Sequence, residues 1–446
     1  MHSVAVIGSG IAGLSAAWQL AEPKAGRRVT LFEAGAHFGG HAHTVDLSLE
    51  GVSHGVDTGF LVFNHQTYPL LTALLAQLGV ETAAAEMSLS VQCTDPDGRP
   101  GLEWSGTSLS TVFAQRRNLL RPRFWRMLAD IIRFNRLATA LAQRPAPEQL
   151  QGCVADFLDT HRFGTAFRED YLLPMIGSIW SCPTDQMLRF PLATLLRFCH
   201  NHGLLQITQR PQWYTVRGGS RQYVRRMLTR LQDSPDHEAR LHAPVLGVRR
   251  LEHGVLLQTA HGSEVFDAVV MACHSDQALA LLGADATPQE TALLGAIRYQ
   301  PNLAVLHTDT HVLPQRTSAW AAWNHERAAG AEAHAPSDRV CLHYWINRLQ
   351  PLPWQQPVIV SLNPVRAIDE SKVHRRIEYA HPVFDLAAME AQAAMHTLQG
   401  QQSTWFCGAW MGYGFHEDGL RSGLEAAAGV HEALLHAPVL LQKGVA

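Results

Sequence analysis

The sequence predicts an α/β protein in which a Rossmann-type nucleotide-binding domain is interleaved with an α+β domain. Three observations lead to this fold class: a glycine-rich turn in a strand–turn–helix context at the N-terminus, a second glycine-rich segment before a helix near the C-terminus, and strand patterns between them. The length of 446 residues also favours two domains, because it exceeds what one small core needs.

The first observation is the segment GSGIAG at residues 8–13, which follows a buried strand and opens a helix. Gly8 permits the tight turn, Gly10 lets the backbone approach a pyrophosphate, and Gly13 lets the helix pack closely on the strand. The helix N-terminus presents free N–H groups to phosphates. The elements expected for this unit are a strand at 3–7, a helix at 13–21 and a strand at 29–33.

Glu33 closes that second strand, at the distance expected for a carboxylate that accepts hydrogen bonds from an adenosine ribose. The segment after it, residues 34–41, reads AGAHFGGH. This segment resembles the one that follows the ribose carboxylate in the flavin amine oxidase and phytoene desaturase superfamily. There a Gly-Gly pair passes close to the FAD pyrophosphate, and an arginine usually follows. Here the pair is Gly39 and Gly40, and His41 stands in place of the arginine.

The second glycine-rich segment lies near the C-terminus. A short strand begins at Thr404 and ends in Gly408, and residues 412–423 then lead into a helix. In the superfamily that this segment resembles, the last helix points its N-terminus at the flavin ring, where its dipole stabilises the anionic reduced flavin. The resemblance places Gly419 and Leu420 beside the ring.

The stretch between these ends adds a β-hairpin pattern at 241–260 and a strand at 267–274. The resemblance therefore implies an amine oxidase-like two-domain flavoprotein. Its FAD domain is assembled from residues 1–75, 215–285 and 400–446, and its substrate domain from 76–214 and 286–399. FAD is the expected cofactor. The residues expected to contact FAD are Gly8, Gly10, Ile11, Ala12, Gly13, Glu33, Ala34, Gly39, Gly40, His41, Thr58, Gly59, Phe60, Val245, Gly408, Gly419 and Leu420.

The chain departs from the amine oxidases of that superfamily in two respects. Those enzymes generally carry a lysine near the flavin and an aromatic cage for the amine. The only lysines here are Lys24, Lys372 and Lys443, none of them expected to reach the ring, and Leu420 stands where a cage tyrosine is expected. Both departures favour a pocket with few polar groups and hence a lipid-like substrate.

The middle of the chain resembles a bacterial branch of the superfamily, some of whose members look like desaturases of methyl-branched acyl chains on phospholipids, in the route to furan fatty acids. The segments that carry this resemblance are 55–64, 180–183, 190–191, 201–205 and 210–223. The leading hypothesis is an FAD-dependent desaturase or oxidase that removes two hydrogens from such an acyl chain. An amine oxidase with an atypical pocket and a flavin-binding accessory protein remain alternatives.

A proton that leaves carbon needs a base within about 3 Å of it. The candidates beside the ring are His416, Glu417 and Asp418, although acidic residues at a helix start also serve as caps. Glu169 and His202 are further candidates, with a solvated helix face and a buried, hydrogen-bonded histidine as their ordinary alternatives. Trp180, Trp213 and Tyr214 could line the pocket or belong to the core.

Arginines are concentrated between residues 113 and 144, against the single acid Asp130. We expect a helix at 122–144 whose apolar face carries Phe124, Met127, Leu128, Ile131 and Phe134. Such a basic amphipathic helix is typical of a segment that lies on an anionic membrane surface. The alternative is a helix packed on the core with a solvated arginine face.

Several classes are disfavoured. The net charge of −3 gives no general attraction to nucleic acid, and no nucleic-acid partner is expected. The seven cysteines and 25 histidines show no metal-ligand spacing, so we expect no metal. The first residues lack a basic n-region, so we expect no signal peptide, and no run of about 18 apolar residues occurs in the sequence. We therefore expect a cytoplasmic protein, in peripheral contact with the inner face of the membrane if the basic helix binds lipid.

Overall fold

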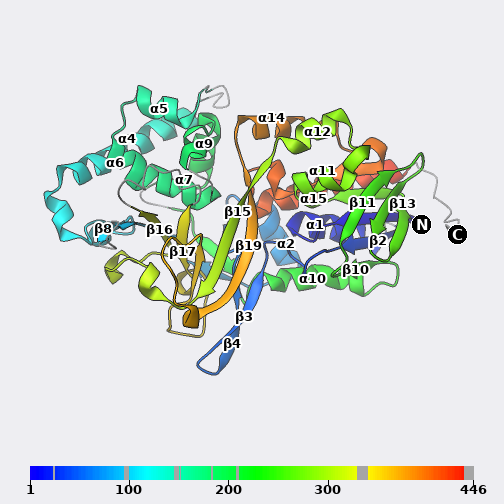
Figure 1. Cartoon of the computed structure of the whole chain (residues 1–446), viewed down its shortest axis with the longest axis horizontal. Coiled ribbons are helices and arrows are strands. Elements are labelled where there is room, and N and C mark those ends of the chain that lie inside the picture. The colour runs from blue at the N-terminus through cyan, green and yellow to red at the C-terminus, as the bar shows by residue number, and fades with distance from the viewer. Residues whose placement is uncertain are drawn as a thin grey trace.

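A computed structural model describes residues 1–23, 26–94, 100–144, 150, 152–181, 184–206, 210–328 and 340–435. Lys24, Lys443, Cys182 and Pro183 lie outside the described residues, as does the end of the last segment expected for the FAD domain. Figure 1 shows a parallel sheet with its helices at one end of the molecule, a helical lobe at the other end, and the long strands β15 and β19 between them.

A five-stranded parallel sheet forms the expected nucleotide-binding unit. Its strand order is β10-β2-β1-β14-β20, and it joins the N-terminal, middle and C-terminal parts of the chain. The strands are β1 (His2–Ile7), β2 (Arg27–Phe32), β10 (Glu238–Arg240), β14 (Ala268–Met271) and β20 (Thr404–Phe406). Most of their side chains are buried on both faces, as their nearly continuous apolar sequences predict. The α/β fold class is thereby confirmed.

Three helices pack beside this sheet: α1 (Ile11–Leu20), α10 (Arg221–Gln232) and α15 (His416–Leu435). Helix α1 begins two residues earlier than predicted. The predicted hairpin at 241–260 is the first part of a three-stranded antiparallel sheet, β11 (Val245–Arg250), β12 (Val255–Thr259) and β13 (Gly262–Phe266). Helices α11 (Ser275–Leu282), α12 (Pro288–Gly295) and α14 (Leu386–Ala394) lie nearby (Figure 1).

A seven-stranded mixed sheet lies beyond the parallel sheet. Its order is β19-β15-β18-β17-β16-β7-β8, and only the β16–β7 pair is parallel. The strands are β7 (Leu89–Thr94), β8 (Pro100–Ser105), β15 (Arg298–His307), β16 (Trp323–Ala328), β17 (Cys341–Trp345), β18 (Ile359–Leu362) and β19 (Val373–Val383). The short helix α13 (Ile346–Leu349) follows β17. All of these strands come from segments expected to form the substrate domain.

Two small sheets and helix α2 (Pro69–Gln77) connect the large sheets. One is the hairpin of β3 (Thr44–Leu49) and β4 (Val52–Asp57); the other has the order β5-β9-β6. Its strands are β5 (Phe63–Asn64), β6 (Thr82–Ala85) and β9 (Trp213–Val216). One apolar cluster runs from α1 through α2 to the seven-stranded sheet, so the core is continuous between them.

The helical lobe has its own apolar cluster. Its helices are α3 (Leu109–Val112), α4 (Pro122–Ala142), α5 (Val154–Thr160), α6 (Thr165–Phe167), α7 (Leu173–Trp180), α8 (Thr184–Leu188) and α9 (Leu192–Asn201). No helix among the described residues is long and apolar enough to cross a membrane.

Helix α4 corrects one expectation. It has nearly the predicted length, but Phe124, Met127 and Phe134 are buried in apolar clusters of the protein. Leu128 and Ile131 also pack against these clusters. The predicted apolar face therefore faces the protein core and is not available to a membrane, as in the core-packed alternative.

Candidate functional site

The turn between β1 and α1 is compact at two of its three glycines and open at the third. Gly8 has φ +102°, and a Cβ there would lie 2.8 Å from the carbonyl oxygen of Ala272. A Cβ on Gly13 would lie 1.9 Å from the carbonyl oxygen of Gly8. A Cβ on Gly10, in contrast, would meet no atom within 4 Å. Gly8 and Gly13 are thus required by packing, while Gly10 faces free space at the start of α1.

Glu33 ties this turn to the following loop. One carboxylate oxygen accepts hydrogen bonds from the Ser9 backbone (3.0 Å) and hydroxyl, and the other accepts one from the Gly35 backbone (2.7 Å). Ala34 is exposed beside it. The segment before β11 passes nearby, since the Ala243 backbone donates to the Glu33 carbonyl (2.8 Å). Half-buried Val245 follows two residues later, and its contact with an adenosine stays a prediction.

The Gly39-Gly40-His41 loop lies against the turn. A Cβ on Gly40 would lie 3.1 Å from Cα of Gly10, so the two glycines allow the close approach of two backbones. The Nε2 atom of His41 is buried and has no hydrogen-bond partner among the described residues. Burial, together with nearby His381 and His274, holds the pKa of His41 well below its usual value. His41 is therefore a neutral group where an arginine was the expected type.

The Thr58-Gly59-Phe60 segment closes over this loop. The Thr58 hydroxyl lies 3.0 Å from the His43 carbonyl and 2.9 Å from the Tyr379 hydroxyl. A Cβ on Gly59 would lie 2.3 Å from the His41 carbonyl oxygen. The ring of Phe60 stacks on that of His416, with centroids 3.7 Å apart. These contacts bring the loop of His41 to the start of α15.

At the start of α15, the three predicted base candidates have hydrogen-bond partners. The Glu417 carboxylate accepts hydrogen bonds from the Leu70 and Leu71 backbones at 2.9 and 3.0 Å, so it caps the N-terminus of α2. Asp418 accepts from the Tyr413 and Phe415 backbones and pairs with Arg421. These contacts are those of structural caps.

His416 contacts the Tyr223 hydroxyl through Nε2 at 2.9 Å. Burial lowers the pKa of His416 to about 3, so this histidine is neutral and a weak proton acceptor at neutral pH. Catalysis by His416, Glu417 or Asp418 stays a prediction, and the hydrogen bonds of the two acids favour the alternative role.

Gly419 and Leu420 pack against α1 in the structure, and their contact with FAD stays a prediction. A Cβ on Gly419 would lie 2.7 Å from Cγ2 of Ile11, and one on Gly423 would lie 2.2 Å from the Ala12 carbonyl oxygen. Leu420 is buried in the same apolar cluster as α1. These residues pack α15 onto α1. Gly408, at the end of β20, donates its N–H to the Ser422 hydroxyl (3.0 Å), which anchors the strand end to α15.

Comparison with known proteins decides the family. Residues 11–345 match the sequence profile described as flavin containing amine oxidoreductase. The chain belongs to this family. No curated protein sequence matches it.

Solved structures share the fold of this family member over almost its whole length. Cyclohexylamine oxidase from Brevibacterium oxydans aligns with a TM-score of 0.64 at 17% identity, covering 98% of this chain and 100% of that chain. A CLA-producing fatty acid isomerase from P. acnes aligns at 0.62 and 15%, covering 96% and 98%. Putrescine oxidase bound to putrescine aligns at 0.65 and 15%, covering 96% and 98%. At these identities the likeness shows the fold alone.

The protein is thus an FAD-dependent oxidoreductase, and its residues fit the cofactor. The free space at Gly10, the uncapped N-terminus of α1 and the unpartnered Nε2 of His41 lie together where the pyrophosphate is expected. Because His41 is neutral, it would offer a bound pyrophosphate a hydrogen bond in place of an ion pair. Glu33 retains acceptor capacity for the ribose, since its hydrogen bonds come from only two residues.

Sequence reasoning singled out His41 but missed the rings grouped around it: His274, His381, Tyr299 and Tyr379. Ring centroids of Tyr379 and His381 lie 4.8 and 5.3 Å from that of His41. His274 stacks on Tyr299 at 4.2 Å. Tyr379 and His381 stand two residues apart on β19, a spacing that places them on one face. This spacing can be read from the sequence, but the contact between β19 and the His41 loop cannot.

His381 has a defined tautomer, which follows from a chain of hydrogen bonds. The Leu303 N–H must donate to a carbonyl, so Oδ1 of Asn363 faces it at 2.9 Å. Nδ2 of Asn363 then donates to Oδ1 of Asn302 at 2.7 Å. Nδ2 of Asn302 in turn donates to Nδ1 of His381 at 3.1 Å. The proton of neutral His381 therefore lies on Nε2, and burial lowers the pKa of the ring to about 4.

Aromatic side chains surround the other side of the α15 start. The ring of Phe198 lies 5.2 Å from that of Phe415 and 3.9 Å from that of His202. Nδ1 of His202 donates to the Phe198 carbonyl (3.0 Å), and burial lowers the pKa of His202 to about 4. Trp180 and Trp213 border the same rings. Phe415, which was not predicted, is the aromatic residue closest in sequence to the expected ring-facing helix end.

Glu169, the remaining base candidate, does not join these rings through any described contact. It lies in an ion-pair cluster with Arg327 (3.4 Å) and Arg123 (3.9 Å), which also includes Asp170. Lys372 pairs with Asp309 at 3.2 Å and with Asp369 at 3.7 Å. Both residues are therefore engaged in ion pairs with other parts of the substrate domain.

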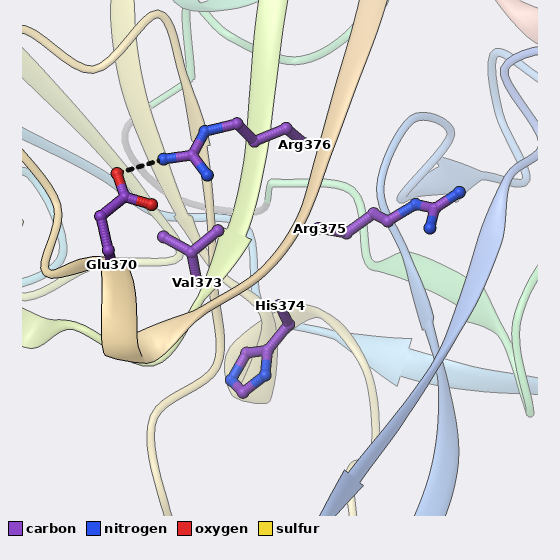
Figure 2. Close-up of a pocket in the computed structure, with 5 residues that line it drawn as sticks. All are labelled: Glu370, Val373, His374, Arg375 and Arg376. Atoms are coloured by element: carbon purple, nitrogen blue, oxygen red, sulfur yellow. Dashed lines mark hydrogen bonds and ion pairs between the residues drawn. The ribbon is translucent and has the colours of Figure 1, made fainter.

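Two further clusters could attract a ligand. The ligand-type atoms of Glu326, Cys341 and His343 lie within 4.8 Å of one another inside the seven-stranded sheet. Arg366 already pairs with Glu326 at 2.6 Å, and its positive charge opposes a bound cation. An open pocket of about 400 Å³ at the start of β19 is lined by Glu370, Val373, His374, Arg375 and Arg376. Figure 2 shows Glu370 paired with Arg376 there, while Arg375 points away.

Proposed function

We propose that this flavoprotein removes two hydrogens from a lipid acyl chain, with a methyl-branched acyl phospholipid as the substrate that its sequence resemblance favours. The observation that carries the proposal is the cluster of uncharged rings at the start of α15, where Phe198, His202 and Phe415 meet. The low pKa of His202 keeps that ring uncharged at neutral pH. Rings of this kind match an acyl chain through apolar burial.

The lysine position supports the same substrate class. Lys372 pairs with two aspartates just before the first residue of β19. Asn302 on β15 and His381 near the other end of β19 lie closer to the His41 loop. The fatty acid isomerase that shares the fold acts, by its name, on a fatty acid, which is compatible with an acyl substrate in this architecture.

Bound FAD would supply the two-electron acceptor for such a reaction. The protein's own contribution is to bind and orient the chain and to exclude water from it. Neutral Nε2–H of His381 and the α1 N-terminus act as hydrogen-bond donors toward the cofactor region. The second hydrogen leaves as a proton. Of the predicted bases, His202 and His416 contact aromatic rings, and their low pKa values make both weak acceptors of that proton.

The test is a comparison of acyl chains by mass spectrometry. The gene is expressed in a bacterium supplied with methyl-branched phospholipids, with the empty vector and the Gly10→Ala variant as controls. Loss of two hydrogens from one acyl species, seen only with the unaltered protein, supports the proposal. An unchanged lipid profile, with peroxide released by the purified protein from putrescine or cyclohexylamine, would instead identify an amine oxidase.

A further inference from the structure

Five large apolar side chains are exposed close together in sequence, between α3 and the middle of α4. We name them the apolar tip. Their exposed fractions are 81% for Leu109, 45% for Leu119, 88% for Leu120, 49% for Trp125 and 44% for Ile132. None of them belongs to the helix face that was predicted to be apolar. In Figure 1 this cyan segment lies at the end of the molecule away from the parallel sheet.

Contacts with neighbouring residues fix the position of the apolar tip. Nε1 of Trp125 donates to the Leu119 carbonyl at 2.9 Å, and the ring of Trp125 lies 5.2 Å from that of Phe113. Buried Gln115 donates to the Gly101 carbonyl at 3.2 Å, which fastens the turn before Leu119 to β8. The exposed leucines are therefore presented by an ordered turn with its own buried polar anchors.

Arginines surround the apolar tip. Residues 109–144 contain eight arginines and one acid, although the whole chain has a net charge of −3. Arg123 and Arg133 are paired with Asp170 and Asp130. The four others nearest the tip are exposed and have no ion-pair partner among the described residues: Arg116, Arg121, Arg126 and Arg136. Their charge is available to an anionic partner.

We infer that the apolar tip and its free arginines form a docking surface for an anionic lipid bilayer. Leucine and tryptophan side chains insert at the headgroup boundary, and arginines bind the lipid phosphates. A nucleic acid would match the arginines but not five exposed apolar side chains. A bilayer matches both, so charge and apolar area point to the same partner.

This inference deepens the proposed function, because the expected benefit of membrane binding, access to acyl chains, rests on that function. The opposite face of α4 packs into the helical lobe, where it contacts α9, the helix that carries Phe198. Helix α4 thus carries part of the apolar tip on one face and contacts the helix of Phe198 with another.

The experiment is flotation of the full-length holoprotein with lipid vesicles, which needs no turnover. Vesicles of phosphatidylcholine alone are compared with vesicles containing phosphatidylglycerol. We expect binding only with the anionic lipid. The double variant Leu119→Ser with Leu120→Ser, and the triple variant Arg116→Gln, Arg121→Gln and Arg126→Gln, should each bind roughly tenfold or more weakly. Tryptophan fluorescence of the unaltered protein should shift to the blue on binding.

The matched control carries Leu386→Ser and Arg28→Gln, which change an equally exposed leucine and an exposed arginine outside the surface. It should bind as the unaltered protein does. Equal flotation of all variants, or the absence of binding to anionic vesicles, overturns the inference. A stable dimer seen by sedimentation also overturns it if the Leu119→Ser, Leu120→Ser double variant is a monomer, because the apolar tip would then bind a second copy of the chain. Turnover of a detergent-dispersed acyl substrate is measured separately, so a failed activity and a failed membrane contact remain distinct results.

Discussion

Asn302 donates a hydrogen bond to Nδ1 of His381 (3.1 Å), and this contact sets which nitrogen of the ring carries the proton. Asn302 is fixed in turn by Asn363, whose own amide is oriented by the Leu303 backbone. The first donor in this series of hydrogen bonds is a backbone N–H, which cannot act as an acceptor. The donor and acceptor roles of both asparagine side chains are therefore fixed. His381 is thereby a neutral donor through Nε2 beside the expected cofactor.

Replacing Asn302 with aspartate should turn the donor facing Nδ1 of His381 into an acceptor. A carboxylate accepts a hydrogen bond from Nδ1–H and stabilises the charged ring, so the pKa of His381 should rise from about 4 by about 1–3 units. Histidine NMR titration of the 13C-labelled protein measures this shift. His202, whose pKa is also about 4 but which bonds to the Phe198 carbonyl, is the internal reference and should not move. An unchanged His381 titration would contradict this series of hydrogen bonds.

Gly10 and Gly13 should respond differently to alanine. Gly10→Ala adds a Cβ to free space, and its φ of −61° suits alanine, so the apoprotein should keep its thermal midpoint. That Cβ fills the space assigned to the pyrophosphate, so FAD content, measured by absorbance at 450 nm, should fall by at least tenfold. Gly13→Ala places a Cβ 1.9 Å from a backbone oxygen and should not fold. Normal FAD content in Gly10→Ala would show that the pyrophosphate does not bind in the space at Gly10.

The parts of the fold that were predictable are those specified by nearby residues. The β1–α1–β2 unit follows from residues 3–33, because turn glycines, apolar strands and the ribose carboxylate all lie within one short segment. Helix α4 shows the limit. Its periodicity predicted which side chains share a face, but Phe124 and Phe134 meet the protein core because α6 and α9 pack against them.

Long-range partners account for most of the site that sequence reasoning missed. Glu417 was expected to act at its own helix start, yet it caps α2, which lies about 350 positions earlier in the chain. His381 meets His41 only because β19 folds beside the Gly-Gly loop. Such contacts depend on the topology of two sheets, and no local pattern at Glu417 or His381 specifies them.

Glu417→Gln should lower stability more than catalysis. A glutamine offers one acceptor oxygen where two backbone N–H groups now bind a carboxylate, and loss of one buried hydrogen bond costs about 1–3 kcal/mol. Turnover per bound FAD should fall by less than about tenfold, whereas removal of a general base lowers it by about a hundredfold or more. The exposed Glu425→Gln, on the same helix, is the control for both measurements. Unchanged stability with a hundredfold loss of turnover would instead make Glu417 the base.

Six histidines should make the protein acid-labile. Burial lowers their pKa values to about 3 or 4 in the folded state: His43, His202, His307, His325, His381 and His416. In the unfolded chain they titrate near about 6.5. Below that pH the unfolded state binds protons that the folded state does not, so the free energy of unfolding decreases as pH falls, down to the folded pKa values. Each group contributes about 1.4 kcal/mol per pH unit.

Asp57 acts in the opposite direction, because burial raises its pKa to about 6 and the folded state binds its proton first as pH falls. Burial also raises the pKa values of Asp170 and Asp418, but the histidines with lowered pKa values outnumber these acids. The thermal midpoint should therefore drop steeply between pH 6.5 and 5, since the histidines together oppose a total stability of only about 5–15 kcal/mol. His202→Phe keeps the stacking on Phe198 and removes one titrating group, so its pH slope should be smaller by about one proton. His253→Phe, at an exposed position, should leave the slope unchanged. A midpoint that is constant from pH 7.5 to 5 would mean that these rings bind protons in the folded state and are less buried than the structure places them.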